Sequence, residues 1–260
     1  VLDPIDLIDG ISLNDLLEKR TQGMMQPKLA EKIQKQTKKE FPDGIPAFGT
    51  DAIRFTFAAL ASFGRDIKFD LKRVEGYRNF CNKLWNASRF VLINLESKSI
   101  NVNAVLSNQD KWILSRLQHT KIEVEKHLAD YRLDLMSQTL YEFVWHDYCD
   151  WYLELSKPLL ENNKTKQGCE ATLLKVLSET LVLLHPIIPF ITEEIFEQSQ
   201  KLHSNSDEKL ISQAFPEPEE ALFNNEAESE VEWLKEFILG IRKIRGEMNI
   251  SPGKPLQCFI

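Results

Sequence analysis

The chain has 260 residues, of which 43% are hydrophobic and 27% charged, and its formal net charge is −7. This composition is ordinary for a folded protein of one or two domains, and it excludes disordered, collagen-like and low-complexity chains. The longest apolar run, residues 181–191, is too short and too interrupted by proline to span a bilayer, and no secretory signal is visible. We therefore expect a cytoplasmic protein without a membrane partner.

The first 70 residues predict short helices and loops. Proline and glycine recur through residues 1–50, and only 13–20 and 27–39 have the pattern of helical pieces. Thr50 is a good N-cap for a helix that begins at Asp51 and ends before Gly64. Because residues 53–61 are apolar nearly all round, we expect this helix to be buried.

Long helices are predicted from residue 70 onward. Asp70 can cap a helix that runs to about Leu95, with an apolar face that repeats every three or four residues. Ser107 and Asp110 form a capping signal for a second helix through about residue 128.

The C-terminal half predicts four more helices. One covers about 133–157 and ends at Pro158, and the next covers 168–185 and is broken by Pro186 and Pro189. A helix over 190–202 follows, with Glu193 and Glu194 in its first turn, and the last covers about 229–248. Apart from a hint at 257–260, strand patterns are absent, so we predict an all-α helical bundle.

Motifs that support catalysis are absent. There is no phosphate-binding loop, dinucleotide fingerprint, nucleophile elbow or HExxH sequence. The four cysteines lie too far apart for a zinc site and are expected to be buried, reduced thiols; they are Cys81, Cys149, Cys169 and Cys258. Glu193–Glu194 has a sufficient explanation in the helix dipole, and His146 with Asp150 is half a site. We expect no catalytic residues, no metal and no cofactor in this chain.

The predicted helix after Asp70 carries a second, polar stripe. At 100° per residue, the stripe collects two cations, two amides and an aromatic ring on one side, and they are Lys72, Asn79, Lys83, Asn86 and Phe90. Lysines contact phosphates, amides read base edges, and an exposed ring stacks on an unpaired base. The alternative is an ordinary solvated face with Phe90 packed against a neighbouring helix.

The charge distribution leaves room for a nucleic-acid partner. Residues 216–236 hold eight glutamates and one lysine, so the rest of the chain is neutral overall. Residues 27–39 and 72–89 are both basic, with five Lys or Arg residues against one glutamate in each. For the binding of an extended polyanion, the distribution of charge along the chain matters more than the net charge.

Six stretches resemble the part of class I aminoacyl-tRNA synthetases that follows the catalytic domain, specifically in the bacterial valyl-tRNA synthetase family. They are VLDPIDLIDG from Val1, FGTDAIRFTFAALASFGRDIKFD from Phe48, RNFCNKLWNASRFVL from Arg78, DYCDWYLELSKP from Asp147, HPIIPFITEEIF from His185 and IRKIRGEMNISPGKPL from Ile241. The HPIIPFITEEIF string is shared with isoleucyl and leucyl enzymes. The strings NKLWNASRFVL and MNISPGKPL are valyl in character.

The resemblance implies a stem-contact segment at 1–68, with a Lys-rich insertion at about 11–46, and an anticodon-binding helical bundle at 69–260. In the family, VLDP follows the KMSKS signature, so the catalytic and editing domains, with their ATP and Mg, and the C-terminal arm are expected outside this chain. A start at Val1 rather than Met agrees with a piece of a longer valine-tRNA ligase. The implied function is anticodon recognition in a valine-accepting tRNA, by a monomer without a DNA partner.

By resemblance, the family's anticodon-contacting positions fall at Lys72, Lys83 and Phe90, all on the polar stripe. We expect Phe90 to stack on a splayed base while the two lysines hold base edges or phosphates. Supporting contacts are expected from Asn79, Asn86 and Arg89, and Trp85 is expected in the core. Lys72 stands where some relatives have arginine, which leaves a base-specific role for it open because lysine lacks the planar bidentate fork.

Three further expectations complete the interpretation. Asp51 and Arg54, three residues apart, fit a helix-surface pair or a domain-docking contact. The same bundle in an isoleucyl or leucyl enzyme would change the tRNA and keep the mechanism. A helical protein-interaction module, using the Glu-rich linker or the Trp- and Tyr-rich segment 141–155, is the remaining alternative, and it predicts binding that is insensitive to the anticodon.

Overall fold

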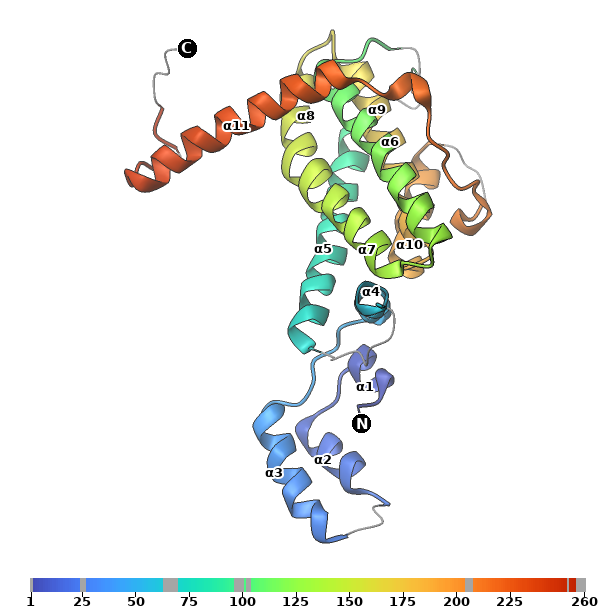
Figure 1. Ribbon diagram of the computed structural model, residues 1–260, viewed down its shortest axis with the longest axis vertical. Helices are drawn as coiled ribbons and strands as arrows, with labels where there is room; N and C mark the ends of the chain where they lie inside the picture. Colours follow the sequence, from blue (N-terminus) through green and yellow to red (C-terminus); the bar gives the residue numbers. More distant parts are fainter. Residues whose placement is uncertain are drawn as a thin grey trace.

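A computed structural model describes residues 2–23, 27–62, 70–95, 101, 104–203, 208–251 and 253–255. The molecule is elongated: a helical bundle occupies one end, three short helices the other, and the last helix projects sideways from the bundle (Figure 1). Within the described residues there is no strand, only an isolated antiparallel bridge between Ile11 and Ile45. The all-α prediction is confirmed. The possible strand at 257–260 lies outside the described residues.

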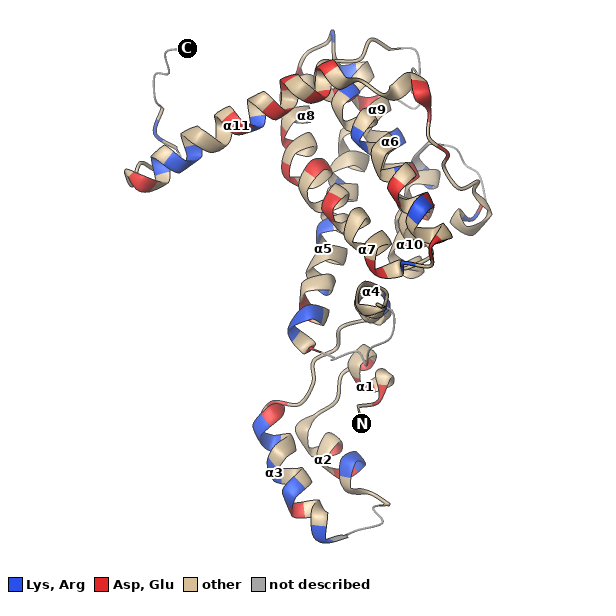
Figure 2. Ribbon diagram, viewed as in Figure 1, with Lys and Arg blue, Asp and Glu red and all other residues tan. Residues whose placement is uncertain are grey.

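The N-terminal end consists of α1 (Pro4–Asp9), α2 (Leu13–Thr21), the 3₁₀ turn η1 (Pro27–Leu29) and α3 (Ala30–Glu40). Helix α1 was not predicted because six residues are too few to show a helical period. It begins where the Asp3 carboxylate accepts the Ile5 N–H, and Ser12 caps α2 in the same way by accepting the Asp15 N–H. The five lysines of the basic segment 27–39 are exposed along η1 and α3 (Figure 2).

Helix α4 (Thr50–Leu60) belongs to two hydrophobic cores at once. On one side Ala52 and Ile53 pack in a small core with α1, α2 and the 41–48 segment, while Phe55 is buried in the main core of the bundle. The helix begins one residue earlier than predicted because Gly49, in a left-handed conformation with φ of 81°, takes the N-cap position. Helix α4 ends at Leu60, before Gly64 as predicted. The predicted domain division at residue 68 lies in 63–69, outside the described residues.

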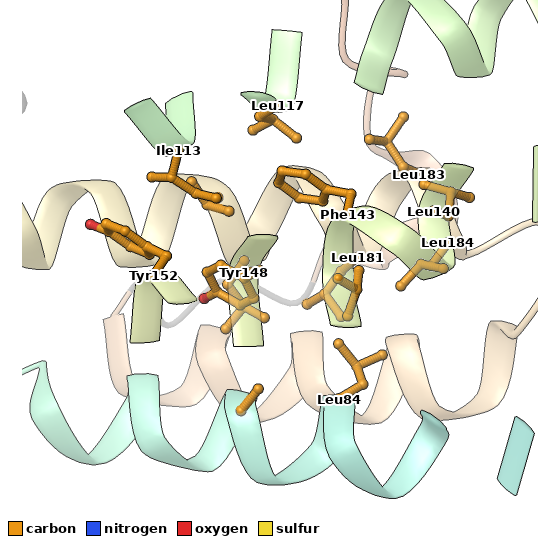
Figure 3. Close-up of a cluster of buried hydrophobic side chains, with 14 of the residues drawn as sticks. Leu84, Ile113, Leu117, Leu140, Phe143, Tyr148, Tyr152, Leu181, Leu183 and Leu184 are labelled. Carbon is orange, nitrogen blue, oxygen red and sulfur yellow. The ribbon is translucent and has the colours of Figure 1, made fainter. Parts of the chain in front are cut away.

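The bundle contains α5 (Leu71–Asn94), α6 (Asn108–Ala129), α7 (Leu133–Glu142), the π-helix η2 (Phe143–Tyr152), α8 (Leu153–Glu161), α9 (Lys166–Leu184) and α10 (Pro189–His203). Aliphatic and aromatic side chains from α5, α6, α7, η2 and α9 meet in its centre (Figure 3). Trp85 packs against this core, as expected. The predicted capping box of α6 is also present, because Ser107 and Asp110 exchange hydrogen bonds with each other's backbone N–H.

The predicted helix over 133–157 was wrong in two respects. It is interrupted by ten residues of π-helix, a conformation that hydrophobic periodicity does not reveal. It also continues past Pro158 to Glu161. A proline inside a helix removes its own N–H from the helical ladder and its ring crowds the carbonyl four residues back. Here Leu153 and Ser156, which precede Pro158, are buried against the bundle, and this packing holds the helix together through that position.

Two boundaries in the C-terminal half also needed correction. Helix α10 begins at Pro189, so Glu193 and Glu194 lie beyond the first turn rather than within it. Glu193 instead accepts the Leu210 N–H and holds the 3₁₀ turn η3 (Leu210–Ser212). Helix α11 (Asn225–Glu247) follows η4 (Glu220–Leu222) and starts four residues earlier than predicted, because Asn224 caps it by accepting the Ala227 N–H.

The acidic linker before α11 is anchored by one buried lysine. The Lys121 ammonium lies 2.6 Å from a Glu179 carboxylate oxygen and donates to the Glu217 carbonyl at 3.1 Å. The neighbouring Gln118 accepts the Glu219 N–H. A paired and hydrogen-bonded buried charge of this kind fixes the path of the chain that it bonds.

Three of the four cysteines are described, and all are free thiols. Cys81 and Cys169 are buried and Cys149 is half-buried, and burial raises the pKa of each thiol to about 12. The expectation of buried, free thiols is confirmed for Cys81 and Cys169, whereas Cys149 is free but only half-buried. Cys258 lies outside the described residues.

Candidate nucleic-acid interface

The polar stripe of α5 is present on the surface as predicted from the helical period. Lys72, Asn79 and Asn86 are exposed, whereas Lys83 and Phe90 are half-buried. Arg89 is exposed beside the stripe. The structure therefore brings the six predicted contact residues to one helix, with two of them partly engaged by the protein itself.

Lys83 is held by the π-helix η2. Its ammonium lies 2.5 Å from the Asp150 Oδ1 atom, donates to the Trp145 carbonyl at 3.3 Å and sits 3.8 Å from the centre of the Trp145 ring. The other Asp150 oxygen is 3.3 Å from His146 Nδ1. His146 and Asp150, which alone were half a site, thus form a group of three with Lys83.

Sequence reasoning missed Trp145 as a contact of Lys83. The two residues are 62 apart in the chain, and the wider turn of the π-helix sets the direction in which Trp145 points. A run of three aromatic residues in the segment 141–145 was the only signal available. These residues belong to the segment 141–155, which has a role only in the alternative interpretation of a protein-interaction module.

Phe90 shows the packing contact of the alternative interpretation and keeps part of its ring exposed. Its ring packs against the main core, yet the side chain stays partly exposed on the stripe. The packed edge fixes the orientation of the ring, and an oriented ring loses little entropy when a base stacks on it.

Aromatic side chains form a continuous row behind the stripe. Tyr77 packs on Phe55 with 4.7 Å between ring centres, Phe80 stacks on Tyr141 at 5.1 Å, and Tyr141 stacks on Trp145 at 5.4 Å. The row connects α4, α5, α7 and η2 and ends at the ring that carries the Lys83 ammonium. It gives the interface a rigid support.

Asp51 and Arg54 dock α4 against the bundle. Arg54 donates through Nε to the Ile187 carbonyl at 2.9 Å and through Nη2 to the Pro186 carbonyl at 3.0 Å. The Asp51 carboxylate accepts the Ile191 N–H at 2.7 Å, in the first turn of α10. Of the two expectations for these residues, a helix-surface pair or a docking contact, the structure shows the docking contact, at a helix N-terminus whose free N–H groups favour an anion.

The docking carboxylate should leave a signature in the pH dependence of stability. Burial raises the pKa of Asp51 above its usual 3.8, against the opposing effect of the two backbone N–H groups. The native state then holds a proton at pH values where the unfolded carboxyl has lost it. Stability from this group therefore falls as pH rises from about 3.8 through the native pKa.

We expect the unfolding free energy of the native sequence, relative to Asp51→Asn, to decrease between pH 3.8 and the higher native pKa and to be constant above it. Denaturant titrations of both proteins at half-unit pH intervals measure this difference. A difference that increases with pH in that window would contradict the direction of the shift. Asp15→Asn, on the exposed cap of α2, is the control for effects of the substitution itself.

The described residues contain no group of three or more His, Cys, Asp or Glu side chains placed to hold a metal ion. No helix in the described part of the chain is long and apolar enough to cross a membrane.

Comparison with known proteins places these features in context. Residues 110–260 match the family described as the anticodon-binding domain of tRNA ligase. Three proteins of Legionella pneumophila, from strains Lens, Paris and Philadelphia 1, are named valine–tRNA ligase, and each is 50% identical to this chain along its whole length. The chain spans 29% of the length of these relatives.

Among solved structures, the crystal structure of a LeuRS–tRNA–LeuAMS ternary complex from Agrobacterium radiobacter K84 shares the fold. The TM-score is 0.52 at 17% identity, and the similarity covers 68% of this chain and 21% of that one. The high identity to the Legionella proteins favours the valyl assignment over the leucyl and isoleucyl alternatives.

Proposed function

Because this chain belongs to the anticodon-binding domain family of tRNA ligases, we propose that it recognises the anticodon of a valine-accepting tRNA through the α5 stripe. The family match covers more than half of the chain. The 50% identity to valine–tRNA ligases is the reason for proposing a valine-accepting tRNA. Aminoacylation itself, with its ATP and Mg²⁺, belongs in this proposal to parts of the relatives that the chain does not match. A cytoplasmic monomer is part of the same proposal.

The arrangement of the stripe supports a different kind of RNA contact for each of its residues. Phe90 offers a partly exposed ring for stacking, Lys72 offers an exposed charge for a phosphate, and Lys83 is oriented by Asp150 and Trp145. An ammonium fixed by two protein partners presents its remaining donor in one direction, and a fixed donor suits a base edge better than a mobile one does. The exposed amides of Asn79 and Asn86 lie between these groups.

The decisive experiment compares two RNAs. Valine tRNA and the same transcript with its middle anticodon base changed are titrated with the chain across a salt series. Phosphate contacts weaken with salt for both RNAs alike, whereas base recognition separates the two by about 1–3 kcal/mol at every salt concentration. We expect Phe90→Ala to abolish this separation, because stacking on the ring positions the base.

Since the Phe90 ring also packs on the core, Phe90→Leu serves as a second variant that keeps apolar volume but removes the stacking face. Phe190→Ala, which removes an exposed ring from α10, is the matched control and should leave the separation intact. Two superimposable binding curves for the native chain would show that it makes charge contacts only. That result would favour the protein-interaction alternative.

A further inference from the structure

The lysines at the N-terminal end of the molecule lie on one side of their helix. At about 100° per residue, Lys32, Lys35 and Lys39 fall within about 60° of one another on α3, and Lys28 in η1 precedes Lys32 by one turn. All four side chains are exposed, and Lys38 is exposed at their edge. The four form a row about 16 Å long, here called the lysine ridge, on the helix that is mostly blue in Figure 2.

The opposite side of α3 attaches the ridge to the protein. Thr37 is buried and Ile33 half-buried there, and the Thr37 hydroxyl accepts a hydrogen bond of 3.0 Å from the Arg20 guanidinium on α2. Where the two helices join the rest of the chain, Ile11 and Ile45 exchange backbone hydrogen bonds of 2.8 and 2.9 Å. The ridge is therefore the outer face of an anchored pair of helices.

The charges of the ridge are not compensated within the protein. Among the described residues no carboxylate pairs with a ridge lysine, whereas Lys19 on the neighbouring α2 lies 2.7 Å from Asp3 and 2.8 Å from Asp6. Successive members of the ridge are three or four residues apart, and like charges at this spacing destabilise a helix. An extended anion bound along the row would remove this repulsion.

The composition of the segment favours a nucleic-acid backbone over other anionic partners. Helix α3 has no aromatic residue, and Leu29 in η1 is the only exposed large apolar side chain in 28–40. Protein interfaces are poor in lysine and rich in aromatic residues, and helices that lie on membranes insert an apolar face. A single strand would need rings on which its bases stack. Lysines without rings instead match the phosphates of a double helix, which are bound through charge.

The ridge lies apart from the proposed anticodon face. Helix α5 begins at the end of the bundle that is nearest to α2 and α3, and its first residues include Lys72 and Arg73 (Figures 1 and 2). A nucleic acid that extends along α5 and beyond its first turn can therefore also reach the N-terminal helices. None of the ridge residues is among the predicted anticodon contacts.

We propose that the lysine ridge binds the phosphate backbone of double-helical RNA without reading its sequence. RNA rather than DNA is the expected duplex because the chain belongs to a family of anticodon-binding domains. The duplex is either an arm of the tRNA that α5 holds or a separate RNA, and both present the same phosphates. The ridge acts independently of the anticodon contacts.

The test titrates the whole chain with an RNA hairpin that has a fully paired stem and no valine anticodon, across a salt series. Joint replacement of Lys28, Lys32, Lys35 and Lys39 by glutamine should lower the affinity about tenfold or more. It should also reduce the slope of log affinity against log salt by about 3, since each lost phosphate contact contributes roughly 0.9. A second hairpin with a different stem sequence should bind the native chain within about twofold of the first.

A matched variant separates the ridge from net charge. Lys126, Lys157, Lys164 and Lys201 are exposed on the bundle, and their joint replacement by glutamine changes the net charge equally. This control should keep both the affinity and the salt slope of the native chain. Equal losses in the two variants, or no hairpin binding by the native chain, would overturn the proposal. The ridge variant should not lower Tm, because its substitutions remove like-charge repulsion.

Vesicles that contain phosphatidylserine test the membrane alternative. We expect the native chain and the ridge variant to bind them equally weakly. Vesicle binding that depends on the ridge, in a chain that does not bind the hairpin, would assign the ridge to a lipid surface and contradict the proposal.

The source of the duplex follows from tRNA binding by the ridge variant. Weaker binding of both valine tRNA and the hairpin identifies an arm of the tRNA, whereas weaker binding of the hairpin alone identifies a separate RNA. In either case the ridge variant should still separate the two tRNAs that differ in the middle anticodon base. Ridge binding without anticodon discrimination therefore contradicts only the proposed function, and discrimination without ridge binding contradicts only the ridge.

Discussion

Replacing Asp110 with alanine is expected to lower the free energy of unfolding by about 2 to 4 kcal/mol. The Asp110 carboxylate is fully buried, and it accepts a hydrogen bond of 2.6 Å from the Tyr152 hydroxyl as well as bonds from the Ser107 N–H and hydroxyl. Its removal leaves the buried Tyr152 hydroxyl with only the Cys169 sulfur, 4.0 Å away, and takes away half of the α6 capping box. Chemical denaturation followed by circular dichroism measures the effect.

The chain contains its own control for this substitution. Ser12 and Asp15 have the same spacing at the start of α2, and there the carboxylate is exposed. Asp15→Ala should cost less than about 1 kcal/mol, because water replaces the lost hydrogen bond. Equal losses at the two sites would show that capping alone is responsible. Tyr152→Phe, made alone and in combination with Asp110→Ala, then measures the coupling energy between Tyr152 and Asp110.

Arg54→Ala is expected to cost about 2 to 4 kcal/mol, because two charged hydrogen bonds to backbone carbonyls are lost and the Ile187 carbonyl, which is part-buried, is left without its donor. Arg54→Lys should recover little of this loss, since an ammonium cannot reproduce two parallel N–H bonds. Hydrogen exchange should show that the amides of α1 and α2 open more often in the variant, because the small core then loses part of its attachment to the bundle.

Arg78→Ala is the matched control on α5. Its guanidinium is 3.7 Å from Glu75 and donates to the Ala47 carbonyl at 3.4 Å, and an exposed pair of this kind contributes at most about 1 kcal/mol. If the Arg54 and Arg78 variants lose similar amounts, the docking role assigned to Arg54 is wrong.

Local sequence patterns predicted the structural features that depend on residues close together in the chain. The apolar period of α5 and the capping signals at Asp70 and Ser107 appear in the structure as expected, because each involves residues within four positions of one another. The stripe itself follows from the same period. Its placement on the surface could therefore be derived before any fold was known.

Local sequence patterns could not predict contacts between residues that lie far apart in the chain. Asp150 reaches Lys83 across 67 residues, through a π-helix that apolar spacing does not encode. The continuation of the helix through Pro158 depends on packing around it, which outweighed the intrinsic cost of proline. A pocket lined by residues of α4, α5 and α7 likewise follows from no local pattern, because it forms only when the three helices are packed together.

The docking contact also sets an order of events during synthesis. Arg54 and its acceptor Ile187 are 133 residues apart. At about 5–20 residues per second, the ribosome adds that length in roughly 7 to 27 seconds. During this interval α5 can already cover Phe55 through Tyr77 and Phe80, but the Asp51 and Arg54 side chains have no acceptor or donor to bond. Attachment of α4 to the start of α10 therefore waits until residues 186–191 have been synthesised.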